Sequence, residues 1–392
     1  MKKLIVAAAG LMLAGTMVST AAADPGVSFT GDGRVRSFYL QDYDFTDSDL
    51  SNWNSRVRLK IKAESKGGAY AVARIRMAEG VWDGTKITRG NTFNNLYTDY
   101  AYVGTPMGPV AVEGGLMPFN VTTWALWDIR VDGLNIKYKT DTTTLVAFYH
   151  KVDEFDEAQI GEFISYNPDG SIKSKVAFDN DLVNDDDVDR YGILLDQKFD
   201  GGWGLVASVW AQNDDQSTTD KDGFAAAAEV TGTAGTVGLL GDIAWYQGDL
   251  LGLEDDPFGV YGQVAAPLGA VTLAAGLGYT MDGFVADGDF GPFIMLSDVS
   301  NIATGIGIGT GGDTLFGALV PSMKVSEELT LTGCIAYADI DNDALDSAFE
   351  VSGSAAYAVT DGATLTAEAG YLDIDGADDP AVGAGLILDI EF

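Results

Sequence analysis

Hydrophobic and polar residues alternate along nearly the whole chain. The clearest case is residues 55–63, in which basic and less polar positions interleave as Ser55-Arg56-Val57-Arg58-Leu59-Lys60-Ile61-Lys62-Ala63. Because successive side chains of a β-strand point to opposite faces, a period of two predicts strands. No long pattern of helical period lies between these segments. The sequence therefore predicts an all-β protein.

Turn residues divide the pattern into about eighteen strands, with sixteen as the alternative count. The predicted strands are 27–40, 52–65, 69–79, 95–105, 109–119, 132–139, 143–153, 188–199, 203–214, 222–234, 236–248, 257–268, 270–281, 314–325, 328–339, 347–359, 363–374 and 381–392. Their connections alternate between tight turns and longer loops, of which 154–187 and 282–313 are the longest. Short periplasmic turns and long extracellular loops are typical of transmembrane antiparallel β-barrels.

The two faces of the predicted strands differ in chemistry. One face is aliphatic at the strand centres, for example at Leu59, Ile193 and Leu277. Aromatic residues of the same parity gather at the strand ends: Tyr39, Trp53, Tyr149, Tyr191, Trp245, Tyr279, Tyr337 and Tyr371 at one end, and Tyr138, Phe199, Trp203, Tyr357 and Phe392 at the other. An apolar band between two aromatic girdles is what lipid requires of a barrel exterior. A soluble β-sandwich, the alternative, gives no reason for this sorting.

The opposite face carries too many charges for a dry core. Uncompensated burial of so many ionised groups would cost more than folding supplies, so this face is expected to line an aqueous lumen. The predicted pore-lining residues are Arg34, Arg36, Arg56, Arg58, Lys60, Lys62, Arg74, Arg76, Glu229, Asp242, Glu350 and Glu368. The basic members lie on the first three strands and form one wall. The acidic members lie on distant strands and are expected to face that wall across the lumen.

The N-terminus has the features of an export signal. Lys2 and Lys3 precede an apolar stretch, Leu4 to Val18, and small residues follow at 21–23. This pattern predicts a signal peptide at 1–23 and a barrel domain at 24–392. An exported barrel of this kind is expected in the bacterial outer membrane as a multi-pass protein.

Composition excludes several classes of function. The formal net charge of −35 argues against nucleic acid as a partner. A single cysteine, Cys334, and a single histidine, His150, leave no disulfide, no histidine cluster and little basis for a catalytic triad. We therefore expect no catalytic residue, no cofactor and no metal. Clusters of carboxylates in the loops predict a hydrated acidic rim, with calcium binding or bridging to lipopolysaccharide as the alternative.

The sequence resembles the porins of Gram-negative bacteria. Four features carry the resemblance: the Gly- and Arg-rich first strand at 29–36, the basic second strand at 54–60, the segment Gly115-Leu116-Met117-Pro118-Phe119, and a last strand that ends in Phe392. The resemblance implies a general-diffusion porin of 16–18 strands that forms a homotrimer. It also implies that Phe392, Ile390 and Leu388 form the signal that the barrel assembly machinery recognises.

The resemblance further implies that the loop after the fifth strand folds into the lumen. That loop would span about residues 120–131 and contain Trp124, Trp127, Asp128 and Arg130. It is short and carries little acid, so the long loops 154–187 and 282–313 are alternative constrictions.

The predicted function is an aqueous channel for passive diffusion of small hydrophilic solutes and ions, with a preference for anions set by the basic wall. Its expected partners are membrane lipid, lipopolysaccharide, the assembly machinery and the solutes themselves. An outer-membrane barrel with a structural, adhesive or enzymatic role is the alternative.

Overall fold

The computed structural model describes residues 26–45, 47–82, 96–153, 162–166, 172–177, 188–214, 221–251, 253, 255–286, 290–291, 293–297, 302–342 and 346–392. The predicted signal peptide and most of 154–187 lie outside the described residues. Among the described residues, no helix is long and apolar enough to cross a membrane. The one helix they contain is a single turn, α3 (Gly248–Leu251).

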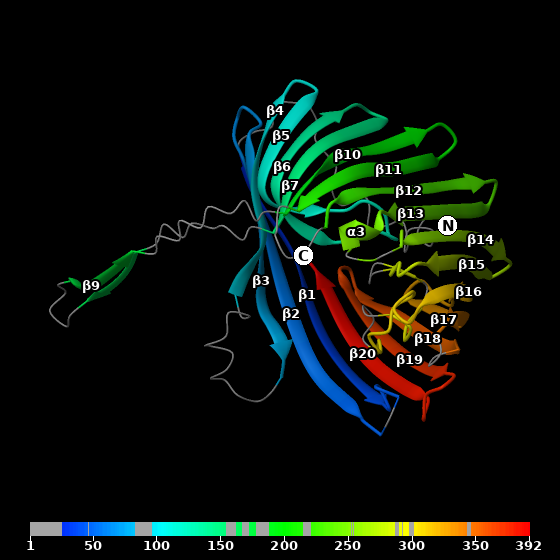
Figure 1. Cartoon of the computed structure of the whole chain (residues 1–392). Helices are drawn as coiled ribbons and strands as arrows, with labels where there is room; N and C mark the ends of the chain where they lie inside the picture. Colours follow the sequence, from blue (N-terminus) through cyan, green and yellow to red (C-terminus); the bar gives the residue numbers. More distant parts are fainter. Residues whose placement is uncertain are drawn as a thin grey trace.

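Eighteen antiparallel strands close into a barrel (Figure 1). Each strand pairs with the next along the barrel, and β1 pairs with β20 to close it. The strands are β1 (Gly26–Gln41), β2 (Leu50–Glu64), β3 (Tyr70–Val81), β4 (Leu96–Met107), β5 (Val110–Phe119), β6 (Ile129–Lys139), β7 (Thr143–Asp153), β10 (Val188–Phe199), β11 (Trp203–Asp214), β12 (Gly223–Ala234), β13 (Val237–Tyr246), β14 (Phe258–Leu268), β15 (Val271–Met281), β16 (Asp313–Lys324), β17 (Leu329–Asp341), β18 (Ser347–Thr360), β19 (Ala363–Ile374) and β20 (Ala381–Glu391).

All eighteen predicted strands are confirmed, and no end differs from its prediction by more than three residues. The sixth strand starts at Ile129, so Arg130 belongs to β6 and not to the preceding loop. Two further strands were not predicted: β8 (Glu162–Tyr166) and β9 (Ile172–Ala177) form a separate two-stranded sheet. Both fall within the long loop 154–187, where the alternation is too short to distinguish from irregular chain.

The outer face of the barrel is apolar. Large hydrophobic residues there are exposed because no described segment covers them, among them Ile193, Leu277 and Leu386. The aromatic residues at both strand ends are exposed or half-exposed on the same face. A soluble protein that left such a band open would aggregate, whereas a bilayer solvates it. The outward parity predicted from the sequence is therefore confirmed.

The barrel closes with its last residue against the first strand. Gly31 and Phe392 exchange two backbone hydrogen bonds, with N···O distances of 2.7 and 3.0 Å. A Cβ atom built on Gly31 would lie 2.6 Å from the Phe392 ring. The ring therefore occupies space that only glycine leaves open, on the same outer face as Leu388 and Ile390. Recognition of this end by the assembly machinery stays a prediction.

Replacing Gly31 by valine should destabilise the closed barrel. The new side chain would clash with the Phe392 ring and with the carbonyl oxygen of Arg58, which also lies 2.6 Å from a Cβ built on Gly31, at a cost of about 1–3 kcal/mol. Gly33→Val is the matched control, because a Cβ at Gly33 meets only Val57, at 3.9 Å. Thermal unfolding followed by heat-modifiable mobility in SDS gels should show a lower midpoint for Gly31→Val alone. Equal midpoints for the two variants would contradict this account of the seam.

Candidate functional site

The basic residues of the first three strands form one continuous inner wall. Cross-strand register places Arg34 opposite Arg56 and Lys60 opposite Arg74. Arg58 lies between Asp32 on one side and Arg76 on the other. Arg34, Arg36, Arg56, Arg58, Lys60, Lys62, Arg74 and Arg76 are all half-buried, so each keeps part of its surface accessible. The structure thus brings together all eight basic residues that the sequence singled out, and we refer to them as the basic wall.

Two aspartates hold the guanidinium groups of the basic wall. Asp32 accepts from Arg58 Nε at 2.9 Å and lies 3.7 Å from Arg56. Asp99, which is almost fully buried, pairs with Arg76 at 2.8 Å, with Arg130 at 3.1 Å, and with Arg74. Lys62 also pairs with Glu64 at 2.8 Å, and Asp389 of β20 lies opposite Arg34 in register, so the basic wall is partly neutralised along its length.

Asp99 reaches the lumen because β4 has a bulge. Arg74 pairs with Tyr100 and Ile75 pairs with Thr98, so Asp99 is an extra residue between them. Strict alternation would place Asp99 with Ala101 on the lipid face, which is why sequence reasoning missed it. The sequence does contain one signal of the bulge, because strict alternation would expose the carboxylate of Asp99 to lipid. Bulges of this kind redirect one side chain at functional sites.

Aromatic rings support the arginines from the side. The guanidinium carbon of Arg74 lies 4.5 Å from the centre of the Tyr100 ring, and that of Arg130 lies 5.9 Å from it. Arg76 lies over Tyr97 in the same way, at 5.7 Å. Cation–π contacts of this geometry orient a guanidinium while leaving its hydrogen-bonding edge available.

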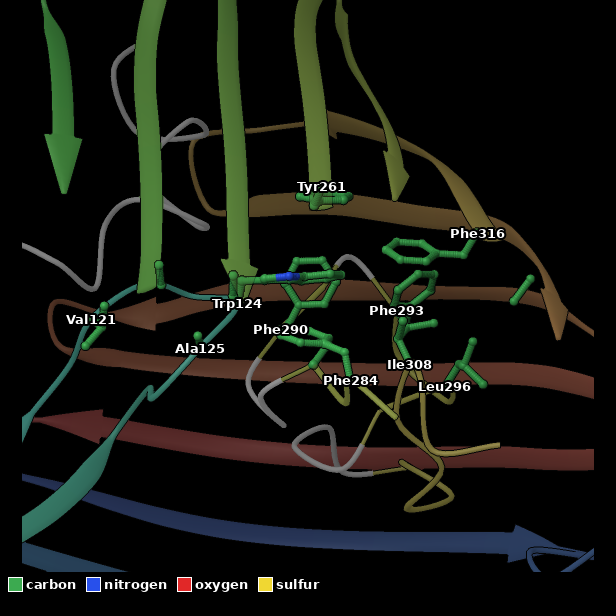
Figure 2. Packing of buried hydrophobic residues seen from close by; sticks show 14 of the residues in the cluster. Val121, Trp124, Ala125, Tyr261, Phe284, Phe290, Phe293, Leu296, Ile308 and Phe316 are labelled. Atoms are coloured by element: carbon green, nitrogen blue, oxygen red, sulfur yellow. The ribbon is translucent and has the colours of Figure 1, made fainter. Parts of the chain in front are cut away.

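The loop 120–128, between β5 and β6, folds inward across the lumen. Thr122 Oγ1 accepts the N–H groups of Trp124 and Ala125, which makes a tight turn at the loop tip. Trp124 is fully buried and stacks on Phe284 at 5.3 Å and on Tyr261 at 6.0 Å (Figure 2). Of the other predicted constriction residues, Trp127 is buried and Asp128 is exposed.

Gly259 makes room for this contact. A Cβ atom at that position would lie 2.4 Å from Trp124 Nε1 and 2.6 Å from Phe284. Because Gly259 is on the inner face of β14, its missing side chain lets the loop tip reach the wall.

The described parts of the loop 282–312 also pack inside the barrel (Figure 2). Glu350 on β18 accepts three consecutive backbone N–H groups from Ile294, Met295 and Leu296, at 2.8, 3.2 and 2.8 Å. Met295 sits over Gly370, where a Cβ would come within 2.6 Å of its sulfur. Ile302 sits over Gly383 of β20 in the same manner. The loop that the resemblance implied and one of the two alternative loops thus both fold into the barrel.

The predicted acidic wall differs from the expectation. Glu229, Asp242 and Glu350 are on the inner face, but the two loops cover them and each is at most 2% exposed. They anchor loops and do not line open space in this structure. Only Glu368 remains half-exposed. Sequence parity could place these side chains inside the barrel, but it contained no information on which loop would cover them.

Comparison with solved structures identifies proteins that share this fold. No protein-family model and no curated protein sequence matches the chain. A BenF-like porin from Pseudomonas fluorescens Pf-5 aligns with a TM-score of 0.60 at 12% identity, over 94% of this chain and 98% of its own. Pseudomonas aeruginosa OpdL aligns with a TM-score of 0.61 at 12% identity, over 93% and 98%. OccK2 (OpdF) of the same species, solved in complex with glucuronate, gives 0.61 at 12%, over 95% and 99%.

These similarities, with the apolar outer band, define the class of protein. The chain has the fold of the bacterial outer-membrane porins, a closed eighteen-stranded antiparallel β-barrel. At 12% identity the comparison establishes the fold alone.

Gly259→Val should release the loop 120–128 from the wall and widen the passage. Overpacking of about 1–3 kcal/mol would shift the docking equilibrium roughly 5- to 150-fold toward the undocked loop. Single-channel conductance in planar bilayers should rise. Gly262→Val on the same strand is the control, because a Cβ there meets nothing within 4 Å. Unchanged conductance in Gly259→Val would show that the docked loop does not limit the passage.

Proposed function

We propose that this barrel is an aqueous channel for passive entry of small hydrophilic solutes and that it favours anions. One observation carries the proposal. The loops cover Glu229, Asp242 and Glu350 on the inner face, whereas the side chains of the basic wall on β1–β3 stay partly accessible. A solute that crosses the lumen therefore travels along positively charged residues.

The chemistry of the basic wall supports carboxylates as the first solutes to test. Arginine presents a planar fork that matches a carboxylate with two parallel hydrogen bonds. OccK2 (OpdF), which has the same fold, was solved with glucuronate, a sugar that carries a carboxylate. Charges in a confined passage are screened less than the acidic loops in bulk salt, so the wall should dominate over the negative mouth.

The enzymatic alternative has less support. His150 is fully buried, contacts Asn135 at 3.1 Å, and packs against the rings of Phe119 and Phe148. These contacts support a structural role for His150. Homotrimer formation and the role of the assembly machinery remain predictions.

Removing two charges from the basic wall should weaken anion preference. Arg56→Ser with Arg58→Ser should shift the reversal potential across a salt gradient toward cations. Lys66→Ser with Lys221→Ser is the matched control, because it removes the same charge from exposed positions outside the wall. The proposal fails if both double variants shift the potential equally, or if neither does.

Asp99→Asn should act in the opposite direction. The isosteric change leaves three arginines without their shared carboxylate, so anion preference should increase while the side-chain shape is kept. Asp128→Asn is the control, since Asp128 also contacts Arg130, at 2.9 Å, but is exposed. A reversal potential that moves toward cations in Asp99→Asn would mean that the freed arginines do not face the passage.

A further inference from the structure

Two carboxylates on the far wall form a pair beneath the tip of the loop 120–128. Glu229 on β12 lies directly opposite Asp242 on β13. Each is 2% exposed, so the pair is removed from water. The basic wall plays no part in this pair, and the inference below is independent of the proposed selectivity.

The segments of the chain nearest the pair contain no basic residue. The sequence contains no Lys or Arg between Lys221 and Lys324, and none in 120–128. These stretches contain every strand from β12 to β15 and the loop that covers the pair. The inward neighbours of the pair in register are Val206 and Tyr261. Two adjacent buried carboxylates without a counter-charge are costly, so something has to compensate them.

Three other well-buried carboxylates have basic partners or three backbone donors, whereas in this pair Glu229 accepts the N–H group of Thr123 at 3.3 Å. Asp99 has three arginines, and Glu113 has Lys137 at 2.5 Å. Glu350 accepts three backbone N–H groups. By contrast, Asp242 Oδ1 is buried with no hydrogen-bond partner. This oxygen therefore has lone pairs available to a further partner.

The Thr123 hydroxyl hydrogen-bonds to both carboxylates, and the three oxygens are close enough together to bind one cation in its place. Thr123 Oγ1 lies 2.9 Å from Glu229 Oε2 and 3.4 Å from Asp242 Oδ2. Two oxygens at right angles around a calcium ion about 2.4 Å away would be about 3.4 Å apart, and at narrower angles closer. Among the described residues no three His, Cys, Asp or Glu gather to hold a metal. A cation here would therefore draw on two carboxylates, a hydroxyl and water.

We propose that a hard divalent cation of the calcium type binds between Glu229 and Asp242 and holds the loop 120–128 against the wall. Calcium accepts carboxylate and neutral oxygens in irregular geometry, which suits this mixed set. The ion would cancel both negative charges and use the unpartnered oxygen of Asp242. Because Thr123 belongs to the loop tip and the carboxylates belong to the wall, the ion joins the two. Removing it would leave the aromatic contact of Trp124 as the main attachment of the loop.

Terbium luminescence provides a direct test, because Trp124 follows Thr123 in the sequence and can sensitise a lanthanide bound there. The purified full-length barrel in detergent should show terbium emission on tryptophan excitation, and calcium should displace it. Asp242→Asn and Glu229→Gln should each lose this component, with little change in shape. Asp373→Asn with Asp375→Asn, which removes two exposed rim carboxylates, should retain it.

A second readout does not rely on energy transfer. Calcium should raise the unfolding midpoint of the wild-type barrel relative to chelator, and Asp242→Asn should abolish that shift while the rim variant preserves it. Trp124→Phe should lose the emission but retain calcium binding by calorimetry. Emission and calcium shift that are unchanged in Asp242→Asn would overturn the proposal. So would a wild-type barrel that shows neither, since a proton shared by the two carboxyls would then compensate the pair. Reversal potentials of the basic-wall variants are unaffected by either outcome.

Discussion

Inside a bilayer no water can replace a missing hydrogen-bond partner, so the backbone of each strand needs a neighbour on both edges. Here this requirement is met by the pairing of β1 with β20, which leaves the eighteen-stranded sheet without an edge in lipid. Closure at this strand number makes a cylinder too wide for wall side chains alone to fill. Inward-folding loops and long side chains occupy part of this width.

The space inside the barrel is occupied differently on its two sides. Along β12–β20, two loops fold inward, and glycines at 259, 370 and 383 leave gaps into which Trp124, Met295 and Ile302 fit. Along β1–β3, long charged side chains project instead, and aspartates and tyrosine rings fix their positions. One side is packed and the other is polar and accessible. This asymmetry gives the passage its chemical character.

Carboxylates have opposite roles on the two sides. Asp32 and Asp99 order arginines and moderate a positive wall. Glu350, Glu229 and Asp242 are covered, and they fasten loops to the wall. Because an ionised oxygen in a dry setting strongly requires partners, a single covered carboxylate can fix the position of a whole loop segment.

The sequence by itself determined the strands, the two faces and the basic wall. These follow from a period of two, which is a local property, and from the rule that consecutive antiparallel strands are neighbours. Register was implied wherever one face had to meet lipid, because a slip of one residue would turn charges outward. The basic wall needed only the parities of β1, β2 and β3, so eight residues far apart in number could be grouped correctly.

Only the tertiary structure determined which loop covers which side chains of the inner wall. Asp99 entered the lumen through a bulge, which is a break in the periodicity on which the sequence argument rests. The covering of Glu229, Asp242 and Glu350 depends on where two irregular loops come to rest. Their position is set by glycine gaps and by contacts between residues more than fifty or a hundred positions apart, such as Glu350 with Ile294 and Thr123 with Glu229. Loops have no repeating pattern from which such contacts could be read, because their conformation is determined by the wall against which they pack.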